Sequence, residues 1–232
     1  MLSNDNSITK SNYLIEASYQ LGLQSQKLIL ACLSKLDPRK EIPKTVSISA
    51  IEFAEIMNLD KASAYKELYN AADALYSASI TIIDSNDDIE LRWIQKRVKK
   101  RKGDGQVTLT WSDDVVKYIS QLKSRFTTYK IRHIADLQST YSIRIYELLI
   151  RFNDTGIRKI SVEDFRKSLC ITDKYKTFKI LRRDVINPSI KELNKRSNLT
   201  IEFETVKKGR SVVALYFTFS DRKEVQQELD LQ

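Results

Sequence analysis

The fold is decided by residues 161–220, SVEDFRKSLCITDKYKTFKILRRDVINPSIKELNKRSNLTIEFETVKKGRSVVALYFTFS. Ser161 can accept hydrogen bonds from the free amides of a first helical turn, and Asp164, three positions on, is a short variant of the capping-box acid. Phe165 and Leu169 then lie on one face of a helix. The stretch therefore begins with a short capped helix, and the polar residues that follow indicate a tight turn.

A second, basic helix follows that turn. Phe178, Leu181 and Val185 have the spacing of an inward face. Pro188 either kinks this helix or begins a new turn with Asn187 as its cap. The other faces of this helix carry five cations: Lys174, Lys176, Lys179, Arg182 and Arg183.

Two runs with a strand's period of two come next. Their apolar positions are Leu199, Ile201 and Phe203, then Val213, Leu215, Phe217 and Phe219. The turn between the runs carries Lys207, Lys208 and Arg210 around Gly209, which can take positive φ. Helix, turn, basic helix and basic-tipped hairpin is the order of a winged helix-turn-helix, whose second helix enters the major groove while the hairpin lies on phosphates. The alternative is a solvated basic helix beside an ordinary hairpin.

The bulk composition agrees with a polyanionic partner. Of the 232 residues, 39 are Lys or Arg and 30 are Asp or Glu, which gives a net charge of +9. Cys32 and Cys170 are the only cysteines, and their apolar surroundings favour reduced core residues in a cytosolic protein. No apolar run approaches the roughly 18 residues of a membrane span. We therefore expect a soluble cytoplasmic protein that does not contact a membrane.

The first half of the chain repeats the pattern of the second. Ser49, Phe53, Met57 and Leu59 match Ser161, Phe165, Leu169 and Ile171 at one constant offset. A helix over 61–77, with Tyr65 and Leu68 buried, would match the second helix with a shift of one position. Strands over 80–83, 91–98 and 106–111 would supply the hairpin. The sequence thus predicts a helix-rich α+β fold of tandem duplicated winged helix-turn-helix domains with β-hairpin wings.

The join between the two domains is expected near Lys123–Tyr129, after a helix over 113–122. This gives domains 1–124 and 125–232, with residues 1–11 as a polar tail. The first hairpin carries a dense run of cations: Lys96, Arg97, Lys99, Lys100, Arg101 and Lys102. This run is interpreted as a wing on phosphates, or as a solvated or nuclear-localisation-like tract.

The helix over 61–77 is less basic than its counterpart in the second domain. Lys61 and Lys66 are its candidate DNA contacts, and Lys66 is offset by Glu67 and Asp73. We therefore assign most base reading to the second domain. The first would contribute phosphate contacts, a second groove or a protein interface, and its strands over 80–83 and 91–98 are the candidate dimer surface.

Catalysis finds little support in the sequence. His133 is the only histidine, so a triad has a single candidate, and no Cys and His cluster suits a metal. The scattered glycines form no phosphate-binding loop. We expect no enzyme activity, no cofactor and no metal. The alternative is a nickase or primase, which needs acids or histidines that the chain does not assemble.

Several segments resemble one known family. They are KSNYLIEA (10–17), QKL (26–28), LDP (36–38), YSIRIYELL (141–149), NPSIKELN (187–194) and VKKGR (206–210). Together, and in this order, they resemble bacterial iteron-type plasmid replication initiators across nearly the whole chain.

The resemblance implies two winged-helix domains that bind double-stranded DNA. It implies monomers that bind direct repeats at a plasmid origin, melt AT-rich DNA and recruit host replication proteins and chaperones. It also implies dimers, formed through the N-terminal domain, that bind an inverted repeat and repress the initiator's own promoter. Lys179, Arg182 and Arg183 would lie in the major groove, and the wing would be Lys207, Lys208 and Arg210. A winged-helix transcription regulator without a replication role is the alternative.

Overall fold

The computed structural model describes residues 6–83, 88–100, 103 and 105–222. The chain forms two compact units that divide between Asp136 and Leu137. The predicted join at 124/125 comes too early, because β7 (Phe126–Lys130) pairs antiparallel with β1 (Ser7–Ser11) and so belongs to the first unit. Within the described ranges, no helix has both the length and the apolar character needed to cross a membrane.

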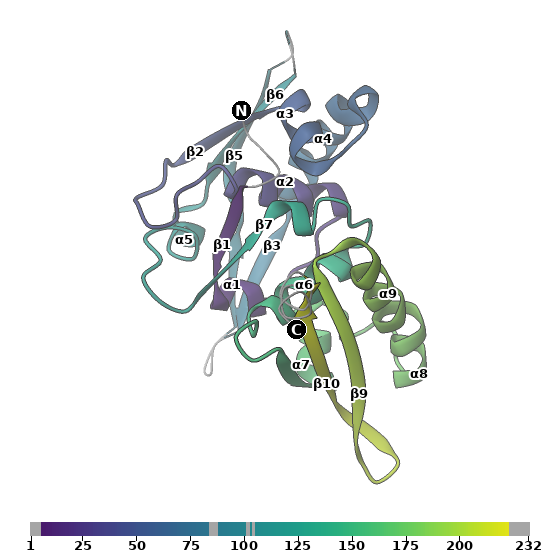
Figure 1. The fold of residues 1–232 in the computed structure, drawn as a ribbon. Coiled ribbons are helices and arrows are strands. Elements are labelled where there is room, and N and C mark those ends of the chain that lie inside the picture. The colour runs from purple at the N-terminus through teal and green to yellow at the C-terminus, as the bar shows by residue number, and fades with distance from the viewer. Residues whose placement is uncertain (1–5, 84–87, 101–102, 104, 223–232) are drawn as a thin grey trace, which may run out of the picture. The chain divides into compact units, whose positions relative to one another are not determined.

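Figure 1 shows the order of the elements. The first unit contains β1 (Ser7–Ser11), α1 (Asn12–Glu16), α2 (Leu23–Leu33), β2 (Thr45–Ser49), α3 (Ala50–Met57), α4 (Lys61–Ser77), β3 (Ser79–Ile83), β4 (Asp88–Arg92), β5 (Ile94–Lys100), β6 (Gln106–Trp111), α5 (Asp113–Val116), β7 (Phe126–Lys130) and η1 (Ile131–His133). The second contains α6 (Thr140–Ile150), β8 (Ile157–Ser161), α7 (Val162–Ser168), α8 (Phe178–Leu181), η2 (Arg182–Ile186), α9 (Asn187–Arg196), β9 (Leu199–Lys208) and β10 (Ser211–Asp221).

The second unit is a winged helix, as predicted. Its antiparallel sheet has the order β8-β10-β9, and α7 packs on β10 with Phe165 stacked on Phe217 at 6.2 Å between ring centroids. Gly209 has φ of 61° at the hairpin turn, as the sequence predicts. The inward position predicted for Val213 is wrong. A β-bulge between Val212 and Ala214 shifts the register, so Val213 is exposed while Ala214 and Leu215 are both buried.

The second helix of this unit passes through Pro188 without stopping. Its middle, η2, is a turn of π-helix, and the Asn187 amide donates to the Arg182 carbonyl in the preceding turn. Asn187 has helical φ and ψ of −60° and −46°, and Ile186 precedes α9, so Asn187 is not the cap of a new helix. The wider π turn accommodates the position where proline lacks a donor and would crowd an α-helix. Leu181, Val185 and Ile186 remain buried through it.

The first unit repeats this topology. Its sheet has the order β2-β6-β5, so in both units the first strand pairs with the last strand of the hairpin, and two helices lie between. The tandem duplication is thus confirmed. The first unit differs by an inserted β3–β4 hairpin. The single strand predicted over 91–98 is two strands, because the chain changes partner at the buried Trp93.

Other predictions for the first unit are wrong in part. Residues 7–11 are not a tail but a strand, in which Ile8 is fully buried. The helix expected over 113–122 covers only Asp113–Val116. The helix over 61–77 has the predicted bounds, with Leu68 buried, but Tyr65 is 43% exposed because it faces the wing at Gly105 instead of the core.

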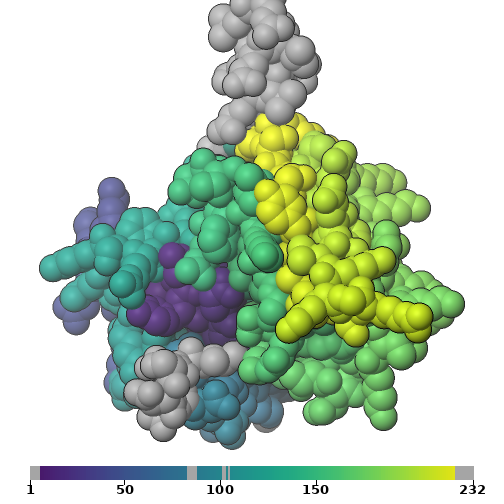
Figure 2. Space-filling model, turned by 90° about the horizontal axis from the view of Figure 1, so that it is seen from below, coloured from purple at the N-terminus to yellow at the C-terminus, as the bar shows by residue number. Residues whose placement is uncertain are grey.

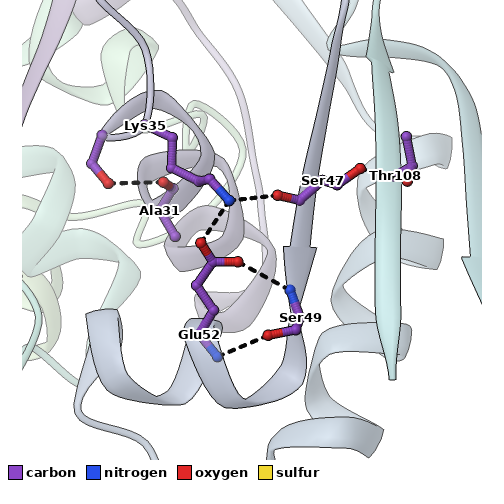
Figure 3. Close-up of polar contacts among 7 residues, drawn as sticks. Ala31, Lys35, Ser47, Ser49, Glu52 and Thr108 are labelled. Carbon is purple, nitrogen blue, oxygen red and sulfur yellow. Dashed lines mark hydrogen bonds and ion pairs between the residues drawn. The ribbon is translucent and has the colours of Figure 1, made fainter. Parts of the chain in front are cut away.

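A polar network fixes the start of α3 (Figure 3). The Ser49 hydroxyl accepts the Glu52 amide at 3.1 Å, and the Glu52 carboxylate accepts the Ser49 amide at 3.2 Å. Lys35, just after α2, donates to the same carboxylate and to the Ser47 carbonyl, both at 2.6 Å. This capping box therefore also connects α2 to β2 and α3.

Candidate nucleic-acid interface

The second helix of the second unit carries the predicted reading residues on its outer side. Lys179, Arg182 and Arg183 are all exposed, while the opposite side packs inward. The guanidinium of Arg182 lies 5.4 Å from the ring centroid of Phe203 on β9. This contact holds the Arg182 stem against the wing and leaves the side chain at the surface.

Arg183 differs from its neighbours because it has an anionic partner in the same helix. Its guanidinium donates to both carboxylate oxygens of Asp184, at 2.5 and 2.8 Å. The hydrogen bond from Arg183 lowers the pKa of Asp184, so the pair stays charged at neutral pH. The Asp184 carboxylate therefore competes with a base or phosphate for this side of the Arg183 guanidinium.

Lys174 and Lys176, predicted on the faces of the second helix, lie instead in the loop before α8, where both are exposed. The Thr177 hydroxyl then accepts the Ile180 amide at 3.3 Å and so caps α8. The free amides of the first helical turn lie beside this loop and favour an anion. The two lysines and the start of the helix thus form one positively polarised edge.

The wing of the second unit carries Lys207, Lys208 and Arg210, all exposed around its turn. β9 and β10 form a long twisted hairpin whose tip projects beyond the helices of its unit (Figure 1). Figure 2 shows the surface of this hairpin in yellow, with side chains that stand out from it. The same hairpin carries Glu202 and Glu204 nearer its base, also exposed. Positive charge is therefore concentrated at the tip.

The wing of the first unit has fewer cations available to bind DNA than its sequence indicates. Lys96 and Lys100 are exposed, but Arg97 and Lys99 turn toward α4 and form ion pairs with Asp73, each at 2.8 Å. The hydrogen bond from Lys99 is the main cause that lowers the pKa of Asp73. Arg101 and Lys102 lie outside the described residues.

Two tyrosines of α4 complete this contact. Arg97 stacks on Tyr76 at 4.4 Å and Lys99 lies 5.5 Å from the ring of Tyr69, whose hydroxyl donates to the Lys100 carbonyl. Burial raises the pKa of Tyr69 to about 12, with a further contribution from its hydrogen bond with Tyr65. The face of α4 toward β5 therefore holds the wing in place.

The remaining face of α4 carries Lys61 and Lys66, both exposed. Lys61 forms an ion pair with Glu55 on α3 at 3.2 Å. The sequence did not indicate the role of Asp73 as a wing anchor, because its cationic partners Arg97 and Lys99 stand on a different element, far along the chain. Among the residues with described placement, no three His, Cys, Asp or Glu side chains come together as a metal site.

Two family models match the chain. "Initiator Replication protein, WH1" covers residues 7–150 and "Initiator Rep protein, WH2" covers residues 161–219. The WH1 match runs past the division at Asp136 into α6, although α6 packs against α9 in the second unit. We place α6 with the second unit on that packing.

Individual relatives agree with these matches. A replication initiation protein of Escherichia coli is 30% identical over 97% of this chain and 71% of its own length. The E. coli PI protein is 24% identical, over 91% of this chain and 82% of its own. A crystal structure of the Pi initiator protein in complex with iteron DNA has a TM-score of 0.81 at 22% identity, covering 94% of this chain and 98% of that chain. The chain belongs to the initiator Rep protein family and contains both its WH1 and its WH2 domain.

Proposed function

We propose that this protein starts plasmid replication by binding directly repeated double-stranded sites at an origin, with the second unit as the main reader. One observation carries the proposal: the second helix of this helix-turn-helix exposes Lys179, Arg182 and Arg183, and the tip of the wing exposes Lys207, Lys208 and Arg210. These are the two parts of a winged helix that meet the major groove and the adjacent phosphates. The iteron DNA bound by the related Pi initiator supports the same class of site.

The first unit contributes phosphate contacts in this proposal. Its reading helix α4 exposes Lys61 and Lys66, and its wing exposes Lys96 and Lys100. Because Arg97 and Lys99 are paired with Asp73, fewer cations are available here than the sequence suggests. The first unit therefore adds affinity with less base discrimination.

The first unit also mediates self-association in this proposal. Within the described residues, β4 pairs with β3 on one side only, and Ile89 on β4 is 37% exposed. An edge strand with an exposed apolar residue can pair with its two-fold mate in an isologous contact. Such a dimer suits an inverted repeat, and hence repression of the protein's own promoter.

The replication role is tested by supplying the chain in trans to a plasmid that carries the DNA flanking its gene but no initiator. The plasmid should be maintained with the wild-type chain and lost with Lys179→Ala/Arg182→Ala, whose side chains are both exposed. Maintenance by both proteins, or by neither, would contradict the proposal. A regulator without a replication role would repress the promoter but never maintain the plasmid.

The proposal also excludes strand cleavage. Supercoiled origin DNA incubated with the protein and Mg²⁺ should stay supercoiled, without a protein-linked 5′ end. A covalent adduct on any tyrosine would place the protein among nicking enzymes instead.

Self-association is tested by sedimentation of full-length variants. Ile89→Lys on β4 should shift the protein to monomer, because it places a charge in the proposed strand pairing. Ile157→Lys is the matched control, since Ile157 is 43% exposed on β8, an edge strand of the second unit. A dimer unaffected by Ile89→Lys but broken by Ile157→Lys would move the interface to the second unit.

A further inference from the structure

The helix-turn-helix loops of the two units differ in length. In the first unit α3 ends at Met57 and α4 begins at Lys61, whereas in the second α7 ends at Ser168 and α8 begins at Phe178. The sequence aligned Tyr65 with Phe178 by assuming a single inserted residue in the second unit. The loop of the second unit is longer than that alignment assumed. The extra residues of the second unit form the loop that carries Lys174 and Lys176.

Arg166 on α7 holds this loop by its backbone. Its Nη1 donates to the Lys174 carbonyl at 2.7 Å, and its Nη2 donates to the Tyr175 carbonyl at 2.6 Å. A planar guanidinium can satisfy two adjacent acceptors at once, which an ammonium group cannot do in the same geometry. Ala54 follows Ser49 in the first unit at the same distance as Arg166 follows Ser161 in the second. The short loop of the first unit needs no such support.

The loop needs this support because its backbone is strained. Tyr175 has φ of 53°, a left-handed conformation that residues other than glycine rarely adopt. Such strain persists only where the surroundings fix it. Besides Arg166, the Tyr175 hydroxyl lies 3.2 Å from that of Tyr141 on α6, and the two rings meet edge to face at 6.1 Å.

Holding the loop backbone also constrains the solvent-exposed lysines of the loop. Lys174 and Lys176 flank Tyr175 and are both exposed, and Thr177 directly after them caps α8. Fixing the carbonyls of residues 174 and 175 therefore fixes where two cations stand relative to the start of the reading helix. Phosphate contacts at such a place set the register of a helix in its groove.

We propose that Arg166 is a positioning residue for DNA recognition, which acts by holding the loop so that Lys174 and Lys176 reach phosphates beside the groove occupied by α8. The inference rests on the proposed function and deepens it. Arg166 itself does not touch DNA in this proposal. Arg166 holds the loop through bidentate donation from its guanidinium to two carbonyls, and its positive charge is not required for this role.

A double-mutant cycle on the full-length protein separates these roles. The variants are Arg166→Ala, Lys174→Ala/Lys176→Ala, and the combination of all three, each titrated with origin repeat DNA over a range of salt. Arg166→Ala and the lysine pair should each flatten the log–log salt slope by roughly 1 to 2, at about 0.9 per phosphate contact. The triple variant should bind like the lysine pair within about two-fold, since coupled residues are not additive.

Arg166→Lys is the discriminating variant, because it keeps the charge and is the milder change if Arg166→Ala folds poorly. It should flatten the salt slope as Arg166→Ala does, with an unchanged circular dichroism spectrum. Wild-type binding by Arg166→Lys, or additive losses in the triple variant, would overturn the inference by showing that Arg166 meets phosphate directly. Wild-type binding by the lysine pair would also overturn it, while leaving α8 as the reader. Absence of specific binding by the wild-type protein would instead remove the proposed function, and this inference with it.

Discussion

Ser49 and Ser161 occupy the same position in the two units. Each ends the strand before the first helix of a helix-turn-helix, and each hydroxyl accepts an amide of the first helical turn, at 3.1 Å from Glu52 and 2.9 Å from Asp164. The acids respond differently. Glu52 reaches back to the Ser49 amide, whereas the shorter Asp164 instead accepts from the Ser161 hydroxyl at 2.7 Å. The duplicated fold therefore begins from the same local chemistry twice.

The two caps can be measured separately. Ser49→Ala should lower the free energy of unfolding by about 1 kcal/mol, whereas Ser49→Gly should cost only a few tenths. Trp93 and Trp111, the only tryptophans, are buried in the first unit, so denaturation followed by tryptophan fluorescence reports that unit. Ser161→Ala should shift the far-ultraviolet circular dichroism transition more than the fluorescence. An unchanged fluorescence midpoint in Ser49→Ala would contradict the contribution of its cap.

Substitutions in the reading helix should change DNA recognition without unfolding the protein. Lys179→Ala, Arg182→Ala and Arg183→Ala remove exposed side chains, so their melting temperatures should stay close to wild type. A bidentate contact to guanine contributes about 1–3 kcal/mol of discrimination. Asp184→Asn should strengthen binding if Arg183 makes such a contact, because it releases that guanidinium. Binding titrations with specific and scrambled DNA measure this, and wild-type specificity in all three alanine variants would rule out α8 and η2 as the reader.

The wing of the first unit should behave as two pairs of cations. Lys96→Ala/Lys100→Ala should flatten the salt slope by roughly 0.9 per contact, equally on specific and random DNA. Arg97→Ala/Lys99→Ala should have a smaller effect, since the Asp73 carboxylate already binds both side chains and offsets one of their two charges. Asp73→Asn should strengthen binding to both DNAs. A loss of affinity in Asp73→Asn would mean that Asp73 positions the wing and does not compete with DNA.

The two cysteines should differ in reactivity. Burial raises the pKa of Cys32 to about 12, so its thiol stays protonated at pH 8, whereas Cys170 is partly exposed. Iodoacetamide at pH 8, followed by mass spectrometry, should label Cys170 first and Cys32 only after denaturation. Because the folded pKa of Cys32 lies above the unfolded value near 9, its contribution to stability is full below pH 9 and declines as pH rises toward 12. Equal labelling rates would contradict the burial of Cys32.

The sequence was informative where the chemistry is local. The capping serines, the bounds of α4 and the turn at Gly209 follow from residues a few positions apart, and all were predicted. The β1–β7 pairing was not, because Thr9 and Thr128 are far apart in the chain and a short polar strand looks like a tail.

Parts of the candidate interface were missed for the same reason. Asp73 meets its cations only when the wing packs on α4, and Arg166 binds carbonyls, which no side-chain pattern reveals. The bulge that exposes Val213 leaves the alternation of apolar residues in the sequence intact. The sequence alone shows which residues are cationic. Tertiary contacts decide which of those cations are available to bind DNA.

A footprint of the full-length monomer on a direct repeat tests the central claim most directly. Two winged-helix units that read successive major grooves on one face of DNA have reading helices about 10–10.5 base pairs apart. We therefore predict protection of roughly 20 base pairs, with two groove contacts in the same orientation. Protection limited to a single groove would contradict this prediction, because the first unit would then not bind DNA.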